Sequence, residues 1–324
     1  MKRSILIVGF LLTAYVFSAG VTATFAQPYP NRPIQLIIPN VAGSIVDIIS
    51  RLFAEDLGKI LNTPIIPINK PGATTIVGTD ALARSKKDGY TLGTLSNAVM
   101  VFPRILNPET IHFDSDKDLE PLGLHILVPL AVGVQGNAPW KTFNELLDYA
   151  KKNPGKVRLN SIGIGSTAHF NMEIIHSLTG AQFTHIPYKG GESVITAVLG
   201  GHVEGTFDAI NKIAPHMESG KMRALLLTNK MAEFPNIPTL DEIGYKQELF
   251  YTWFAYYAPS GLPEDVKKVL IPAVEKVIKN PELKAKIEKM QLVVNYKSPT
   301  EMKKMVPGEY ERALAIAKKA GLSK

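Results

Sequence analysis

The chain has 324 residues, a formal net charge of +7 and no cysteine. This length favours two domains and allows a large hydrophobic core. The absence of cysteine excludes disulfides, Cys-ligated zinc, iron–sulfur clusters and a thiol nucleophile, and it also excludes a lipoprotein anchor. The basic residues are spread over many segments, whereas nucleic-acid binding usually shows a concentrated basic face. We therefore expect no nucleic acid partner.

The first 26 residues have the layout of a secretory signal peptide. Lys2 and Arg3 precede an apolar run at 5–21, and the small residues Thr24 and Ala26 flank Phe25 before the mature chain. The alternative is an uncleaved membrane anchor, but the run is short for the ~20 residues that a spanning helix needs. We expect cleavage after Ala26 and an exported, periplasmic protein that is not lipid-anchored, with a net charge of +5.

Apolar runs and helical periodicity alternate along the rest of the chain. Strands are expected at 34–39, 64–69, 90–96, 122–134, 156–161, 183–187, 203–207, 223–228 and 251–258. Helices are expected at 47–60, 76–84, 142–153, 168–178, 193–199 and 264–280, then at 299–321 with a kink or break near Pro307-Gly308. A capping box, Thr142-x-x-Glu145, opens the helix at 142–153. This alternation predicts an α/β fold of two lobes with parallel sheets covered on both faces; the pattern leaves open which lobe the tail covers.

A loop of small residues connects the first expected strand to the first helix. Such a loop exposes backbone N–H groups at a helix N-terminus, where the helix dipole favours a carboxylate or phosphate. The alternative is an ordinary turn capped by Ser44 or Asp47. The candidate ligand-binding residues here are Asn40, Val41, Ala42, Gly43, Ser44 and Asp47.

A second loop of the same character, 163–169, lies between the strand at 156–161 and the next helix. It lacks the third glycine of a dinucleotide fingerprint, the lysine of a P-loop and the spacing of a nucleophile elbow. Its N–H groups and hydroxyls suit an anion, and a neutral His169 is either a hydrogen-bond partner of the ligand or a packing residue. The candidates here are Gly165, Ser166, Thr167 and His169.

Further candidates lie at other strand ends. Tyr188, Lys189 and Gly190 follow the strand at 183–187, and Lys189 is either a ligand contact or a solvated side chain. The remaining candidates are Thr94, Ser96 and Asn97 at the end of the third strand and Asp208 after the strand at 203–207. The histidines form neither H-E-x-x-H nor a close pair, so we expect no metal, and we expect no cofactor.

An ordered series of motifs resembles the Bug-type receptors, the extracytoplasmic substrate-binding proteins of tripartite tricarboxylate transporters. The series covers nearly the whole mature chain. It includes Tyr29-Pro30-x-Arg32-Pro33-Ile34, Pro39-x-x-Ala42-Gly43-x-x-x-Asp47-x-x-x-Arg51, Asn69-Lys70-Pro71-Gly72-Ala73, Asp88-Gly89-Tyr90-Thr91-Leu92, Gly165-Ser166-x-x-His169, His185-Ile186-Pro187-Tyr188-Lys189-Gly190 and Pro238-Thr239-Leu240-x-Glu242-x-Gly244.

The resemblance implies a type II periplasmic-binding-protein fold, with two α/β lobes joined by two crossover strands. Lobe 1 would comprise 27–124 and 248–324, and lobe 2 would comprise 125–247. Such receptors bind small carboxylates through backbone N–H groups of the first loop, waters and second-lobe groups at 165–169 and 188–190. They deliver the ligand to a large and a small membrane subunit. Asn40, Ser44 and Thr75 depart from the family pattern.

We therefore expect a receptor that binds a small organic anion as a monomer, and not an enzyme. One alternative is an exported hydrolase that uses Ser166 and His169, the one tempting pair of a nucleophile and a base. The other alternative is a ligand sensor that docks on a membrane kinase.

Overall fold

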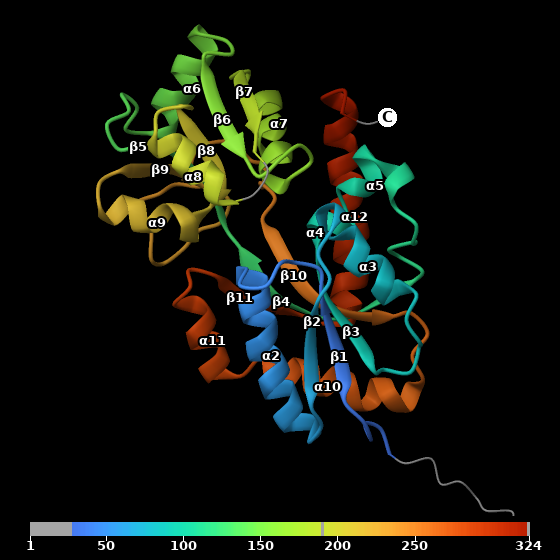
Figure 1. The fold of residues 1–324 in the computed structure, drawn as a ribbon. Coiled ribbons are helices and arrows are strands. Elements are labelled where there is room, and N and C mark those ends of the chain that lie inside the picture. Colours follow the sequence, from blue (N-terminus) through green and yellow to red (C-terminus); the bar gives the residue numbers. More distant parts are fainter. Residues whose placement is uncertain (1–27, 189–190, 323–324) are drawn as a thin grey trace, which may run out of the picture.

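The computed structural model describes residues 28–188 and 191–322, which form two lobes, each built on its own β-sheet (Figure 1). The expected signal peptide, Lys189 and Gly190 lie outside the described residues. Within the described ranges, no helix combines the length and the apolar character needed to cross a membrane.

Lobe 1 contains a six-stranded sheet in the order β11-β4-β10-β3-β1-β2. The parallel strands β1 (Ile34–Ile38), β2 (Ile65–Asn69) and β3 (Thr91–Ser96) form one side. β10 (Thr252–Pro259) pairs antiparallel with both β3 and β4 (Leu119–Val128), and β11 (Val293–Lys297) pairs antiparallel with β4. The expected parallel pairing is confirmed for β1, β2 and β3 but not for the rest of the sheet, because β10 returns from the other lobe and runs against its neighbours.

Lobe 2 contains a five-stranded mixed sheet in the order β7-β6-β8-β5-β9. Its strands are β5 (Leu130–Gln135), β6 (Val157–Ser161), β7 (Phe183–Pro187), β8 (Gly205–Ala209) and β9 (Met222–Leu227). The single strand expected at 122–134 is two strands, because the chain leaves one sheet and enters the other at Pro129, which has no N–H to donate to a ladder.

Most helices lie where periodicity predicted them. The longer ones are α2 (Ile45–Leu61), α3 (Ile76–Ala83), α6 (Phe143–Lys152), α7 (Thr167–Thr179), α8 (Gly191–Leu199), α9 (Ile210–Glu218), α10 (Glu264–Ile278), α11 (Pro281–Glu288) and α12 (Pro299–Lys319). The capping box of α6 is confirmed. The sequence pattern did not predict α9, α11, β11 or the four-residue helices α4 (Asn97–Met100) and α5 (Pro103–Leu106). The expected break in α12 is absent, since the helix continues through Pro307.

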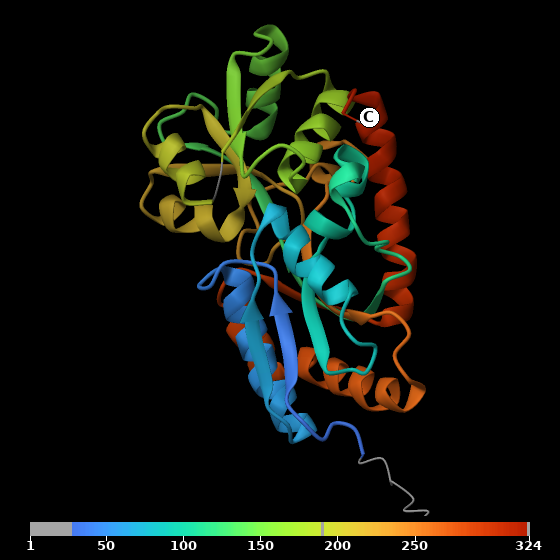
Figure 2. The same cartoon turned by 45° about the vertical axis from the view of Figure 1, so that its right-hand side comes forward.

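The tail belongs to lobe 1 but also contacts lobe 2. β10 and β11 are strands of the lobe 1 sheet, α10 and α12 pack on that sheet, and α12 extends alongside α7 of lobe 2 (Figures 1 and 2). Phe102, before α5, stacks on Phe170 of α7 with ring centroids 4.5 Å apart. Asn171 of α7 donates to the carbonyl of Phe250 and accepts its N–H, both at 2.7 Å. These buried contacts anchor α7 to lobe 1.

The strand ends of the two lobes face one another. In Figures 1 and 2 the carboxyl ends of β1 and β6 point toward the opposite lobe. β2 and β3 run parallel to β1, and β7 and β8 run parallel to β6. The loops after these strands, which we call the facing loops, therefore lie between the two lobes.

Candidate functional site

The facing loop between β1 and α2 is a tight capped turn. Ser44 is the N-cap of α2, and its hydroxyl accepts the N–H of Asp47 at 3.3 Å. Gly43 has φ of +80°, which favours glycine, and its N–H donates to Oδ2 of Asp47 at 2.9 Å. The helix begins at Ile45, two residues before the expected start, because Ser44 and not Asp47 is the cap.

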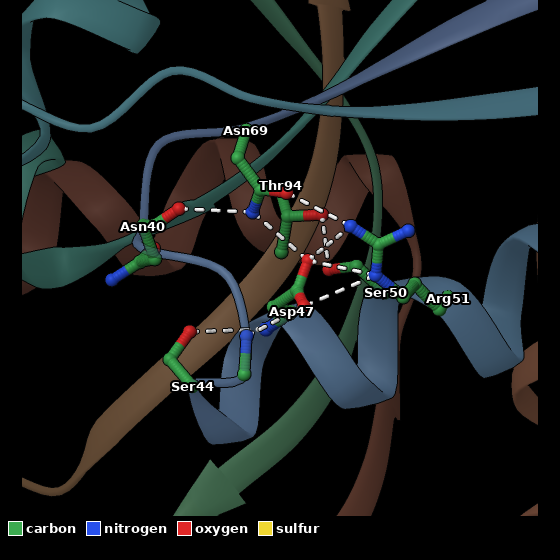
Figure 3. A network of polar contacts seen from close by, with 8 residues as sticks. Asn40, Ser44, Asp47, Ser50, Arg51, Asn69 and Thr94 are labelled. Carbon is green, nitrogen blue, oxygen red and sulfur yellow. Dashed lines mark hydrogen bonds and ion pairs between the residues drawn. The ribbon is translucent and has the colours of Figure 1, made fainter.

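Asp47 is the centre of a polar network that fixes this loop (Figure 3). Its carboxylate also accepts hydrogen bonds from Nε of Arg51 at 3.0 Å and from Nδ2 of Asn69 at 2.9 Å. Nδ2 of Asn69 donates in addition to the carbonyl of Asn40 at 3.0 Å, so the network ties the loop to the end of β2. Asp47 is only 3% exposed. The structure therefore makes it a residue that positions the loop.

The network also keeps Asp47 ionised. Burial raises its pKa, but the hydrogen bonds from Arg51, Gly43 and Asn69 outweigh burial and lower the pKa to about 2. The negative charge is balanced by the guanidinium of Arg51, whose Nη2 also donates to Oδ1 of Asn69 at 2.8 Å. The first turn of α2 thus contains an internally paired carboxylate.

The facing loop between β6 and α7 repeats the geometry of the first. Ser166 is the N-cap of α7, with φ −70° and ψ 159°, against −66° and 158° for Ser44. Its hydroxyl accepts the N–H of His169 at 3.3 Å. Gly165 has φ of +78°, and its N–H donates to Nδ1 of His169 at 3.1 Å. The two lobes therefore present capped turns of the same shape, with a carboxylate in one and an imidazole in the other.

Two histidines of lobe 2, His169 and His185, stack on one another. The rings of His169 and His185 lie 4.4 Å apart, and Nε2 of His185 is 2.7 Å from Oγ of Ser161. Burial lowers the pKa of His169, and burial together with the neighbouring His169 lowers the pKa of His185 to about 4. His169 is 6% exposed, and its Nδ1 accepts from Gly165, so the structure favours the packing alternative for this residue.

The geometry does not support the hydrolase alternative. A nucleophilic serine needs a base that accepts its proton. Oγ of Ser166 instead accepts the backbone N–H of His169 as a helix cap, and the acceptor nitrogen of His169 is bonded to Gly165. Among the described residues, no group of three or more His, Asp and Glu side chains is arranged to hold a metal ion.

Three candidates at the end of β3 are buried beneath the surface of the protein. Oγ1 of Thr94 lies 2.9 Å from Oγ of Ser50, and Ser96 is 3% exposed. Asn97 donates its two amide hydrogens to the carbonyl of Tyr251 and to Oε1 of Glu309, both at 2.8 Å. The structure therefore shows Asn97 as a buried link between Tyr251, next to β10, and Glu309 of α12, and a ligand contact of Asn97 stays a prediction.

The remaining described candidates lie in lobe 2, in α7, in β8 and after β7. Thr167 is buried and its Oγ1 accepts from Oγ1 of Thr252 at 3.1 Å. Asp208 is buried and forms an ion pair with Lys212 at 3.0 Å. The N–H of half-buried Tyr188 donates to the carbonyl of Ser161 at 2.9 Å. Each of these three residues therefore already has a hydrogen-bond or ion-pair partner within the protein.

Several residues of these networks were not among the candidates, and four of them lie beside the two capped turns: Arg51, Asn69, Ser161 and His185. Arg51 is four residues after Asp47 and so shares its helix face. Asn69 pairs with Ile38 at the end of parallel strands, next to the first loop. That placement follows only from the pairing of β1 with β2, which the sequence pattern did not predict.

A cavity of about 490 Å³ lies elsewhere, between α7 and α12. Its lining includes Glu173, Ser177 and Arg312, none of which belongs to a facing loop. We therefore do not assign ligand binding to it.

Comparisons with known proteins find similarity along nearly the whole chain. The sequence model of TctC, described as the tripartite tricarboxylate transporter family receptor, matches residues 49–322. A Cupriavidus necator protein, named UPF0065 protein in gbd 5'region, is 33% identical over 301 residues, or 92% of this chain and 90% of that protein. Two solved structures are similar. That of the periplasmic binding protein BugD has a TM-score of 0.77 and 28% identity, covering 91% of this chain and 100% of that chain. That of an R. palustris protein with adipate has a TM-score of 0.80 and 25% identity, covering 91% and 99%.

These matches confirm the resemblance to Bug-type receptors and the fold of two α/β lobes that it implies. Periplasmic receptors of this kind bind substrates and do not transform them, so the expectation of a binding protein is confirmed. The chain belongs to the TctC family of tripartite tricarboxylate transporter receptors.

Proposed function

We propose that this receptor captures a small carboxylate between its lobes and delivers it to the large and small membrane subunits of a tripartite transporter. The observation that carries the proposal is the repeated capped turn, with Gly43 and Ser44 in one lobe and Gly165 and Ser166 in the other. Each turn opens a helix, and helix N-termini favour anions. The bound adipate of the similar R. palustris structure supports the same class of ligand.

In this proposal backbone N–H groups at 40–44 and 165–167 contact the carboxylate, apart from those of Gly43, Ser44, Gly165 and Ser166, which donate within their own turns. Asp47 and His169 hold those two loops in shape, because each accepts the N–H of a loop glycine. Tyr188, Lys189 and Gly190 supply further contacts from the end of β7. Thr94, Ser96 and Asp208 support the loops from the protein interior, because each of these residues is buried.

We also propose the organisation of the mature protein. Lobe 1 comprises 27–124 and 248–324, and lobe 2 comprises 125–247. Binding of the ligand brings the two lobes together by a hinge motion at the segments that join them. Cleavage after Ala26 releases a periplasmic monomer, and the absence of cysteine leaves no site for a lipid anchor.

The test is a thermal-shift screen of purified mature protein against dicarboxylates, tricarboxylates, aromatic acids and acidic amino acids, followed by titration calorimetry. An acid at 100 times its dissociation constant should stabilise the folded state by about 2.7 kcal/mol. Stabilisation by at least one such acid supports the proposal. Binding of uncharged compounds with no response to any acid would contradict it.

A further inference from the structure

The two facing loops that open α2 and α7 expose large apolar side chains. Val41 in the first loop is 62% exposed, and Ile162 and Ile164 in the second are 51% and 72% exposed. All three follow parallel strands whose carboxyl ends point toward the opposite lobe (Figure 2). Ligand sites are usually lined by apolar side chains with a few placed polar groups, so this exposure has a use at the proposed site.

The buried carboxylates beside these loops are paired within the protein. Asp47 is held by Arg51 at 3.0 Å, and Asp208 is held by Lys212 at 3.0 Å. The imidazole of His169 is neutral, because burial lowers its pKa. Neither of these two carboxylates therefore presents an unpaired negative charge to a bound carboxylate.

The hydroxyls of these loops take part in the turns themselves. Oγ of Ser44 and Oγ of Ser166 accept the N–H of Asp47 and of His169, and Oγ1 of Thr167 accepts from Thr252. A hydroxyl on a ligand body that lies against Val41 and Ile164 would lose its hydrogen bonds to water. Burying a hydroxyl without a partner is unfavourable, whereas burying a methylene against apolar side chains is favourable.

Resting on the proposed function, we infer that the ligand is a carboxylic acid with an unsubstituted hydrocarbon body, and that Val41 and Ile164 contact this body from opposite lobes. The two side chains then determine specificity against hydroxylated acids of the same length and charge. The apolar side chains of Val41 and Ile164 contact the methylene groups of the ligand, and the backbone amides of the two loops bind the ligand's carboxylate.

The experiment compares acids that differ only in hydroxyl groups, by calorimetry on the full mature chain. The pairs are succinate and malate, adipate and galactarate, and tricarballylate and citrate. We expect the unsubstituted acid to bind about tenfold or more tightly in each pair that binds, because a hydroxyl in an apolar site reduces affinity by about 10- to 100-fold.

Variants assign the preference to side chains. Val41→Ser and Ile164→Ser should each reduce the ratio between the paired acids by at least about threefold. The matched controls are Val269→Ser on α10 and Ile66→Ser on β2, which are 38% and 46% exposed away from the facing loops. The controls should leave the ratio unchanged, and thermal unfolding checks that all four variants fold.

The outcomes separate the two proposals. Equal or tighter binding of the hydroxylated acids overturns this inference and leaves the proposed function intact. A full wild-type ratio in both Val41→Ser and Ile164→Ser also overturns it, and an accompanying loss of transport would then indicate contact with the membrane subunits. If no acid of any class binds, the proposed function itself fails.

Discussion

Asp47 and His169 hold equivalent positions in the two lobes. Each lies four residues after a glycine with positive φ and accepts the N–H of that glycine, Gly43 at 2.9 Å and Gly165 at 3.1 Å. The first is an ionised carboxylate and the second a neutral imidazole. The lobes therefore present the same backbone shape through different chemistry, and each acceptor can be tested separately.

Replacing Asp47 with asparagine should loosen the first loop. The amide keeps one acceptor oxygen, but its NH2 group faces the Arg51 donor and either the Gly43 or the Asn69 donor, which bond different oxygens of Asp47. We expect the free energy of unfolding to fall by about 2 kcal/mol at pH 7, and adipate affinity to fall about tenfold, measured by urea unfolding and calorimetry.

The matched control for this variant is Glu55→Gln, on the same helix. It removes an exposed ion pair with Lys59 at 2.8 Å, which solvent screens. The control should leave stability and affinity nearly unchanged. Wild-type affinity in Asp47→Asn would show that the network does not position the loop.

Alanine at the two loop glycines should separate backbone strain from packing. Gly43→Ala adds a Cβ with no neighbour within 4 Å but at φ +80°, where a side chain costs about 1–2 kcal/mol. Gly165→Ala has the same strain, and its Cβ would also lie 2.5 Å from Cδ1 of Leu106. We expect both variants to bind adipate more weakly and Gly165→Ala to be the less stable of the two.

Gly220→Ala is the control for strain alone, since it has φ +70° with open space around the Cβ and lies in the turn before β9. It should lower the melting temperature without changing affinity. Equal stabilities of the Gly43 and Gly165 variants would contradict the close packing of the second loop on α5.

The histidines make stability depend on pH. The pKa of His185 is lowered to about 4, against an ordinary value near 6.5, so between these values the unfolded chain binds a proton that the folded chain does not. Stability is therefore full above pH 6.5 and falls as the pH falls toward 4. His125 and His169, whose pKa values burial also lowers, act in the same direction.

We expect wild type to lose stability between pH 7 and pH 5, with His185 contributing about 1–2 kcal/mol. His185→Gln should reduce this loss, measured as the difference in unfolding free energy at the two pH values. The control is His202→Gln at an exposed position. A pH dependence unaltered in His185→Gln would refute a neutral folded state for this ring.

Asn171 should be the main polar anchor between α7 and Phe250, in the segment that leads into β10. Asn171→Ala leaves the N–H and carbonyl of buried Phe250 without their partners. We expect the free energy of unfolding to fall by about 2–4 kcal/mol, measured by urea unfolding. Asn153→Ala, which removes a single exposed bond at the end of α6, is the control. A loss no larger than that of the control would disprove the anchor.

The elements and the facing loops were predictable because they depend on local pattern. The apolar face of α2 repeats at helical spacing, and the turns at Gly43 and Gly165 follow from small residues between a strand and a helix. The pattern did not predict strand direction, because β10 pairs with β3 and β4 only after the chain has returned from lobe 2.

The role of Asn97 was not predictable for the same reason. Its partners Tyr251 and Glu309 are 154 and 212 residues away in the sequence. A polar residue at a strand end suits a ligand site as well as a buried hinge contact, and only the tertiary fold distinguishes them. α9 escaped prediction because it has nine residues and contains Pro215, which argues against a helix.

A crystal structure of the mature protein with adipate bound would show whether the two capped turns hold the ligand. We expect one carboxylate of adipate within hydrogen-bond distance of backbone N–H groups in both 40–46 and 164–168, with its methylene groups against Val41 and Ile164. Adipate bound away from these two loops, or held by charged side chains without their backbone amides, would contradict the proposed site.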